Sequence, residues 1–251
     1  MSSSATRLAR LSHTEAEAEI ARGAVALWPT GATESHGPHL PLGTDVIIAE
    51  ATCDAAAPQI ASELGLRTLV LPPLALSVTE YAAPFAGTIG VSPEAALPYV
   101  RDVLRSCARQ GFKAVCMVNA HLEPAHRFVL RDAVKDISEP PCPIVIADPC
   151  DRRWVSELTE EFQSGACHGG RYETSLVMAV GDDVREDVRA GLPPQPIDLV
   201  GAMKAGKKTF SEMGATESYF GAPAEATAEE GRATYRVLGS IVTRVLQEAL
   251  S

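Results

Sequence analysis

Short apolar runs alternate with longer segments of helical spacing along the first part of the chain. Each run has four or five residues, most of them apolar, and turn residues follow it, which is typical of buried strands. Strands that are apolar on both faces are characteristic of parallel sheets. The predicted strands cover residues 24–27, 68–71, 114–118 and 144–147.

The segments between and after these runs have the length and spacing of helices. Ser92-Pro93 precedes one of them, where the serine offers an N-cap and the proline fits the first helical turn. This alternation predicts one α/β domain over residues 1–251, with a mainly parallel sheet and helices on both faces. A proline-rich run at 193–196 is predicted to be a loop or crossing segment. The predicted helices cover residues 46–64, 94–110, 125–138, 154–162, 173–180 and 226–250.

Composition and charge narrow the class of protein. Of the 251 residues, 46% are hydrophobic and 22% are charged, as in globular proteins that bury one large core. The net charge is −10, and the Lys and Arg residues are scattered, which argues against a nucleic-acid partner. Residues 1–10 lack the apolar core of a secretory signal, and no segment resembles a membrane span. We therefore expect a cytoplasmic protein without a membrane partner.

The cysteines do not form a metal-binding or redox motif. They are far apart, and no Cys-x-x-Cys pair occurs. We expect reduced thiols that are mostly buried, because free cysteine behaves as a small apolar residue. Only Cys167, beside His168, is expected to lie near a site. The six cysteines are Cys53, Cys107, Cys116, Cys142, Cys150 and Cys167.

The loop after the first predicted strand carries two carboxylates and two imidazoles between Thr30 and Asp45. Glu34 and His36 are two residues apart, so on extended backbone both side chains point the same way. Asp45 lies at the start of a predicted helix, where a helix-dipole role is the alternative to metal binding. His39, in the same loop, is expected to make a hydrogen bond that stabilises it.

A second pair of this kind, His121 and Glu123, directly follows the strand predicted at 114–118. Ligands bind beyond the carboxyl ends of parallel strands, so the two loops are expected to meet there. Converging carboxylates repel one another unless a cation neutralises them. Nitrogen and oxygen ligands without cysteine suit Zn²⁺, Mn²⁺ or Fe²⁺. His126, at the start of the next helix, is predicted to face solvent or to support the ligands.

A third segment, from His168 to Leu176, is a glycine-rich turn that enters a helix. A histidine before a helix is commonly a surface or hydrogen-bonding residue. A glutamate in the first helical turn, here Glu173, is favoured by the helix dipole alone. The residues by themselves therefore leave a site role for this segment open.

The run from Gly31 to Asp45 closely resembles the signature of the creatininase (creatinine amidohydrolase) family. The resemblance continues in order through residues 85–88, 117–123, 168–176 and 226–231, so it spans nearly the whole chain. It implies a three-layer α/β/α sandwich, commonly assembled as a homohexamer. It also implies a homo-oligomeric hydrolase that acts on a small-molecule amide.

The same resemblance implies a binuclear site for two divalent ions, Zn²⁺ or Mn²⁺, with Fe²⁺ as a further option. The resemblance implies that Asp45 bridges the ions. Glu34 and His121 then hold one ion, and His36 and Glu123 hold the other. His168 is the implied general acid/base, and Glu123 is placed with it in the catalytic set. Glu173 is expected either to support the ligands or to be an additional ligand.

The implied reaction is hydrolysis of a non-peptide C–N bond, in an amide, cyclic amide or formamide, by a metal-activated water. Creatinine amidohydrolase proper and formamidopyrimidine deformylase are the named alternatives. Leu122 replaces an aromatic residue of creatininase, Ala120 replaces a glycine, and Ser164 replaces a tryptophan that closes over substrate, which disfavours creatinine itself. Trp154 and the loop around Tyr81 are candidates for walls of the substrate site.

Two readings of other classes remain. A non-catalytic, metal-stabilised binding module would keep the same ligands without turnover. A phosphoesterase would also use two metals, but it needs basic residues near the loops, and only Arg127 and Arg171 are candidates.

Overall fold

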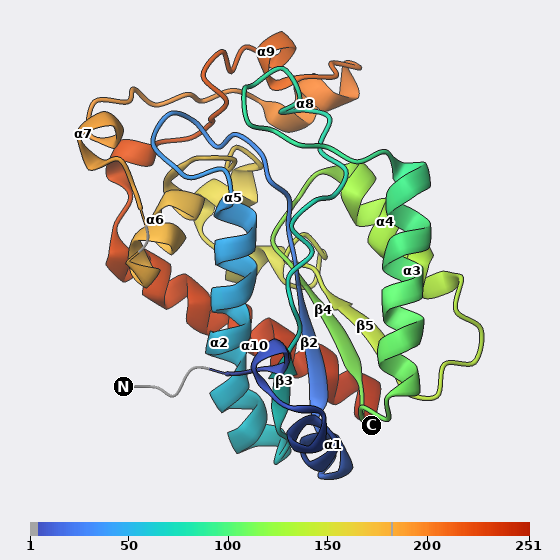
Figure 1. Ribbon diagram of the computed structural model, residues 1–251. Helices are drawn as coiled ribbons and strands as arrows, with labels where there is room; N and C mark the ends of the chain where they lie inside the picture. The colour runs from blue at the N-terminus through green and yellow to red at the C-terminus, as the bar shows by residue number, and fades with distance from the viewer. Residues whose placement is uncertain (1–4, 182) are drawn as a thin grey trace.

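A five-stranded parallel sheet in the order β1-β3-β2-β4-β5 forms the centre of the molecule (Figure 1). This computed structural model describes residues 5–181 and 183–251. Residues 1–4, part of the segment 1–10 that was expected to lack a secretory signal, lie outside the described residues. The predicted strands are confirmed to within three residues at each end, and β1 was not predicted. The strands are β1 (Thr6–Arg7), β2 (Val25–Thr30), β3 (Thr68–Val70), β4 (Val115–Asn119) and β5 (Ile144–Ala147).

Helices cover both faces of the sheet, as predicted. The helix α10 packs against α2 and α6 on one face, and α3 packs against α4 on the other (Figure 1). The strand β2 shows why two layers are needed, because Val25 and Leu27 belong to one apolar cluster and Ala26 and Trp28 to the other. The major helices are α1 (His13–Ala21), α2 (Thr44–Leu64), α3 (Pro93–Arg109), α4 (Pro124–Lys135), α6 (Arg171–Val180) and α10 (Ala228–Leu250).

Local sequence signals set several helix ends. Ser92 accepts a hydrogen bond from the backbone N–H of Ala95 at the start of α3, and Pro93 occupies its first turn. Thr227 caps α10 in the same way through the N–H of Glu230. The helix α2 ends at Gly65, which adopts the left-handed conformation that glycine tolerates.

The helix predicted over 154–162 is wrong. The structure has a 3-10 turn, η2 (Val155–Glu157), and a separate short helix, α5 (Glu160–Ser164). Extended backbone at Leu158 separates the two, and Thr159 then caps α5 by accepting a hydrogen bond from the N–H of Phe162.

The chain between α6 and α10 contains short elements that the apolar pattern did not predict. The proline-rich run 193–196 lies there, with a single bridge between Gln195 and Gly221. The elements are α7 (Glu186–Arg189), α8 (Leu199–Lys204), α9 (Phe210–Met213) and η3 (Pro223–Glu225). Figure 1 shows α8 and α9 above the sheet, next to the loop that follows β3.

Two further expectations concern cysteines and membranes. All six cysteines are free thiols, and four of them are buried, while Cys107 and Cys150 are partly exposed. None of the helices in the described part of the chain is long and apolar enough to cross a bilayer.

The topology places the two ligand-rich loops side by side. The strands β2 and β4 are neighbours in the sheet, and their last residues, Thr30 and Asn119, pair with each other. The loops that carry Glu34 and His121 therefore leave the sheet from adjacent positions at the same edge, as predicted.

Candidate metal centre

Three separate segments bring five buried ligand-type side chains together above the carboxyl ends of β2 and β4. Glu34 and His36 lie in the loop after β2, and Asp45 lies in the first turn of α2. His121 follows β4, and Glu173 lies in the first turn of α6. Each of these side chains is at most 2% exposed, so their charges are not screened by bulk water.

Two glycines permit this close approach. A Cβ atom at Gly31 would lie 2.7 Å from the Cβ of Asp45. Only glycine therefore allows the first residues of the loop to pack against α2. Gly169 has a φ of +61°, and a Cβ there would lie 3.0 Å from the carbonyl oxygen of His36. Gly31 therefore lets the loop after β2 approach α2, and Gly169 lets the third segment approach the first.

Asp45 lies at the centre of the site, and its two oxygens face different histidines. Oδ1 lies 3.1 Å from Nε2 of His36, and Oδ2 lies 3.0 Å from Nδ1 of His121. Nδ1 of His121 is also 3.3 Å from Oε1 of Glu34, and Nε2 of His36 is 3.5 Å from Oε2 of Glu173. One carboxylate is thus shared by two sets of ligand atoms.

Metal-sized groups, with ligand atoms within 4.8 Å of one another, occur in three combinations among the described residues. Two of them share Asp45: Glu34, Asp45 and His121 form one, and His36, Asp45 and Glu173 form the other. The third is Glu34, His36 and His168. Nε2 of His36 is buried without a hydrogen-bond partner. An unpaired buried nitrogen among carboxylates is what a metal site requires, so these residues fit a pair of divalent ions.

The far nitrogen of each ligand histidine is held by the backbone. Nδ1 of His36 lies 3.1 Å from the carbonyl oxygen of Glu34, and Nε2 of His121 lies 2.9 Å from that of Val78. A proton on each of these nitrogens donates to the carbonyl. The other nitrogen faces the carboxylates and is the one that would give its lone pair to a bound metal ion.

Burial and charge shift the pKa values of these groups in opposite directions. Burial lowers the pKa of His36, but Asp45 and Glu173 outweigh it and raise the pKa to about 10. Burial raises the pKa of Asp45, yet His36 and His121 hold it well below its usual range. The pKa of Glu173 rises to about 8, mainly through burial. The site therefore strongly favours positive charge close to Asp45.

Glu123, expected to share an ion with His36, is not among the carboxylates within 4 Å of Nε2 of His36 in the described part of the chain; these are Glu34, Asp45 and Glu173. The carboxylate of Glu123 accepts hydrogen bonds from the backbone N–H groups of Glu80, at 3.0 and 3.1 Å, and Tyr81, at 3.2 Å. The chain after Asn119 is no longer a strand, so the rule for side chains two residues apart on extended backbone does not apply to His121 and Glu123. Glu173 takes the place beside His36 instead.

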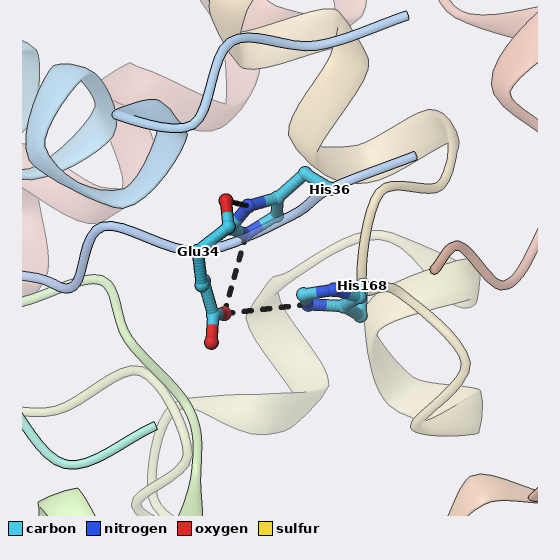
Figure 2. Close-up of side chains that lie close together, drawn as sticks. All are labelled: Glu34, His36 and His168. Carbon is cyan, nitrogen blue, oxygen red and sulfur yellow. Dashed lines mark hydrogen bonds and ion pairs between the residues drawn. The ribbon is translucent and has the colours of Figure 1, made fainter. Parts of the chain in front are cut away.

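His168 stands next to the ligands, on the side of the third segment. Figure 2 shows its ring beside His36 and its Nδ1 directed at Glu34, with Nδ1 3.7 Å from Oε1 of Glu34. Its Nε2 lies 2.9 Å from the carbonyl oxygen of Ser35. Burial and the neighbouring His36 lower the pKa of His168 to about 3, so the ring is neutral.

The other two histidines of the loops support the site. His39 is buried, and its Nε2 lies 2.9 Å from the hydroxyl of Thr174, which agrees with the expected stabilising role. His126 is fully buried rather than facing solvent, so of its two predicted places only the supporting one holds. Its ring lies between the hydroxyl of Ser77, at 2.7 Å, and Oδ1 of Asn119, at 3.0 Å.

A cavity of about 230 Å³ opens above the metal-sized groups. Its lining includes His168, Glu123 and Tyr81, so the loop around Tyr81 does contribute a wall. Trp154 is not part of the lining. It is 5% exposed and lies between the guanidinium groups of Arg153 and Arg244, at 4.6 and 4.3 Å from its ring centre.

Several residues that touch the site had no signal in the sequence. The hydroxyl of Thr79 donates a hydrogen bond to Oε2 of Glu34. Phe210, from α9, lies against the ring of His168, with the ring centres 4.3 Å apart. Both residues come from irregular segments, where neither apolar spacing nor ligand-type residues mark a position as part of a site.

Comparison with known proteins gives a consistent result. A family model named Creatininase and described as creatinine amidohydrolase matches residues 9–246. A mycofactocin precursor peptide peptidase of Mycobacterium ulcerans is 30% identical over 226 residues, covering 87% of this chain and 83% of the relative. The creatinine amidohydrolase of Pseudomonas putida is 28% identical over 192 residues, covering 68% and 70%. A crystal structure of creatinine amidohydrolase superposes with a TM-score of 0.72 at 22% identity, covering 99% of this chain and 100% of that one.

Proposed function

This chain belongs to the creatininase family, and we propose that it hydrolyses the C–N bond of an amide at a pair of divalent metal ions. The single observation that carries the proposal is the position of Asp45, whose two oxygens face His36 and His121 at 3.1 and 3.0 Å. Relatives named as an amidohydrolase and as a peptidase support C–N hydrolysis as the reaction class. The peptidase relatives widen the expected substrates from non-peptide amides to peptide bonds as well.

We assign one ion to Glu34, Asp45 and His121, and the other to His36, Asp45 and Glu173. The assignment replaces Glu123 by Glu173, because the carboxylate of Glu123 is held by backbone N–H groups. Zn²⁺ and Mn²⁺ suit this set of nitrogen and oxygen donors, and Fe²⁺ is compatible with it. When bound, two such ions polarise the substrate carbonyl and lower the pKa of water.

His168 is proposed to move the protons of the reaction. The hydrogen bond from Nε2 to the carbonyl of Ser35 fixes one proton and leaves Nδ1 free on the side of Glu34 and the cavity. Nδ1 can therefore take a proton from the attacking water and pass it to the departing nitrogen.

Glu123 is proposed to orient the substrate rather than to hold metal. Its carboxylate lines the cavity and is fixed by the N–H groups of Glu80 and Tyr81. A carboxylate held in this way has lone pairs left to accept a hydrogen bond from an amide N–H. Glu123 therefore remains one of the proposed catalytic residues but is no longer one of the proposed metal ligands.

The other enzyme class fits the cavity less well. A phosphoesterase needs basic groups free to contact a phosphate, yet Nε of Arg127 lies 2.9 Å from Oδ2 of Asp148. Arg171 pairs with Glu225 and Glu230, at 3.5 and 3.4 Å. Amide hydrolysis requires neither cation. A binding module without turnover keeps the same ligands and is separated from the enzyme by the assay below.

We further propose a cytoplasmic homo-oligomer, with the homohexamer common in the family as the expected form. The six free thiols support a reducing compartment. Exposed apolar side chains, among them Ile89 and Tyr99, are available for contacts between subunits.

Elemental analysis of purified variants, combined with an amide hydrolysis assay, tests the proposal. Wild-type protein and Glu123→Gln should bind two ions per chain, Glu173→Gln should lose one, and Asp45→Asn should lose both. The control Glu63→Gln changes an exposed glutamate of α2 and should keep both ions and full turnover. Two ions in Glu173→Gln and one in Glu123→Gln would reverse the ligand assignment. A metal-loaded protein that cleaves no member of a broad amide panel would support the binding module instead.

A further inference from the structure

The cavity above the metal centre is covered by a segment far from the ligands in sequence. Leu199 and Met203 of α8 and Phe210 of α9 all line it. The N–H of Phe210 donates to the carbonyl of Tyr81 at 2.9 Å, and the two rings lie 5.8 Å apart. This contact joins the covering segment to the loop that holds Glu123.

The remaining walls of the cavity are also apolar. Leu122 lies beside the ligand His121, and Val155 and Phe162 come from the segment around η2 and α5. The thiols of Cys150 and Cys167 complete this side, and burial raises the pKa of both, so they stay protonated and neutral at neutral pH. Polar and charged groups of the lining are thus concentrated at the metal ligands and around Glu123.

One basic side chain, Arg127, belongs to the described lining of the cavity. Its Nε is held by the buried carboxylate of Asp148, which also accepts from Arg131 at 3.0 Å. The contact with Asp148 therefore fixes the position of the Arg127 guanidinium. Its place in the lining does not indicate a binding site for an anion.

We propose that the substrate is an amide that carries an aliphatic or aromatic group, and that this group packs against Leu122, Phe162, Leu199, Met203 and Phe210 while the amide lies at the metal ions. This inference rests on the proposed function and names its substrate class. Apolar burial supplies the binding free energy of such a group, about fourfold in affinity for each buried methylene. A small, wholly polar amide leaves these walls in contact with water.

A matched series of hydroxamates tests the inference, because the hydroxamate head binds divalent metal while the attached group varies. The series carries methyl, isobutyl, 2-phenylethyl and carboxyethyl groups. Dissociation constants are measured by calorimetric titration of the metal-loaded protein, and kcat/KM is measured for the corresponding primary amides. The isobutyl and phenylethyl compounds should bind at least about tenfold more tightly than the methyl compound.

Two variants locate the apolar group. Met203→Asp and Leu199→Asp place charge on α8 at side chains that are already partly exposed. Each should bring the ratio of isobutyl to methyl affinity close to one. The control Phe128→Asp makes a similar change at an exposed position on α4, outside the cavity, and should keep the wild-type ratio.

The outcomes separate the two proposals. Equal affinities for the methyl and isobutyl compounds, or tightest binding of the carboxyethyl compound, would overturn the apolar substrate class while metal binding and amide cleavage stand. If Met203→Asp and Leu199→Asp each still bind two ions, the metal centre is intact, and a loss of the preference for the isobutyl compound then comes from the changed cavity wall. Absence of both metal binding and amide cleavage in the wild-type protein would instead overturn the proposed function.

Discussion

The carbonyl oxygen of Val78 accepts a hydrogen bond from Nε2 of His121 at 2.9 Å, and this contact fixes which nitrogen of His121 faces Asp45. Histidine exchanges its proton between two nitrogens, so a partner for one nitrogen decides the role of the other. The main chain of an irregular loop, rather than another side chain, makes this choice here.

The same loop contacts other groups of the site through consecutive residues. Thr79 donates to Glu34, and the N–H groups of Glu80 and Tyr81 donate to Glu123. Ser77 contacts His126, whose ring lies 4.8 Å from that of His121. Residues 77–81 therefore form one support along the side of the metal centre, and a change at one of them should alter metal binding.

Replacing Ser77 with Ala should weaken metal binding. The hydroxyl donates to Nδ1 of the neutral, buried His126, whose Nε2 then donates to Oδ1 of Asn119, and Oδ1 also accepts from the N–H of His121. Loss of partners that support ligands typically lowers metal affinity about 10- to 100-fold. Competition with a fluorescent chelator should show a decrease of this order for the ion held by Glu34, Asp45 and His121.

Ser62→Ala is a matched control, because that exposed hydroxyl donates to the carbonyl of Gln59 within α2 and lies outside the cavity lining. It should retain wild-type metal affinity. If Ser77→Ala loses thermal stability but binds both ions as tightly as wild type, the contact with His126 supports the fold and not the metal centre.

The sequence predicts the parts of the site that depend on strand topology. The strands at 24–27 and 114–118 are continuous apolar runs, and the rule for parallel sheets then places Glu34 and His121 at one edge. The two-residue spacing of His121 and Glu123 does not by itself decide where Glu123 points, because the chain turns towards α4 after Asn119.

Other parts of the site depend on long-range contacts that no local pattern records. The support from Ser77 to Tyr81 acts largely through backbone groups, which every residue type carries. The elements α8 and α9 have only six and four residues, too few for the apolar period of a helix to appear. Met203 and Phe210 can therefore be recognised as part of the cavity lining only once the fold is known.

Replacing Trp154 with Phe should leave catalysis unchanged and lower stability slightly. The indole lies between Arg153 and Arg244 and outside the cavity lining, so its role is packing and cation–π contact. Phe keeps most of the apolar burial but gives a weaker cation–π contact, and we expect a loss of about 1 kcal/mol. Urea unfolding measures the loss, and a change in KM of more than twofold would contradict this placement.

Replacing Gly231 with Ala should destabilise the protein strongly. A Cβ at this position of α10 would lie 1.9 Å from the backbone carbonyl oxygen of Ser175 in α6, so the two helices must separate. Overpacking of this kind costs about 1–3 kcal/mol or more. Because α6 carries Glu173, metal content should fall as well. The control Gly191→Ala meets only the carbonyl oxygen of Val188, at an ordinary 3.7 Å, and should retain both the midpoint of urea unfolding and the metal content.

The thiol of Cys150 should react with iodoacetamide in a way that reveals its surroundings in the cavity. Burial, reinforced by Asp148, raises its pKa to about 12, against about 8.5 for a free cysteine. Only the thiolate reacts, so its rate should rise about tenfold per pH unit from pH 8 to 10 and should not level off near pH 9. Mass spectrometry of peptides labelled for short times measures the profile at this residue. The same peptide labelled in urea is the control and should level off near pH 9. A plateau in the native protein at that pH would show that the thiol faces water, which contradicts an apolar wall at Cys150.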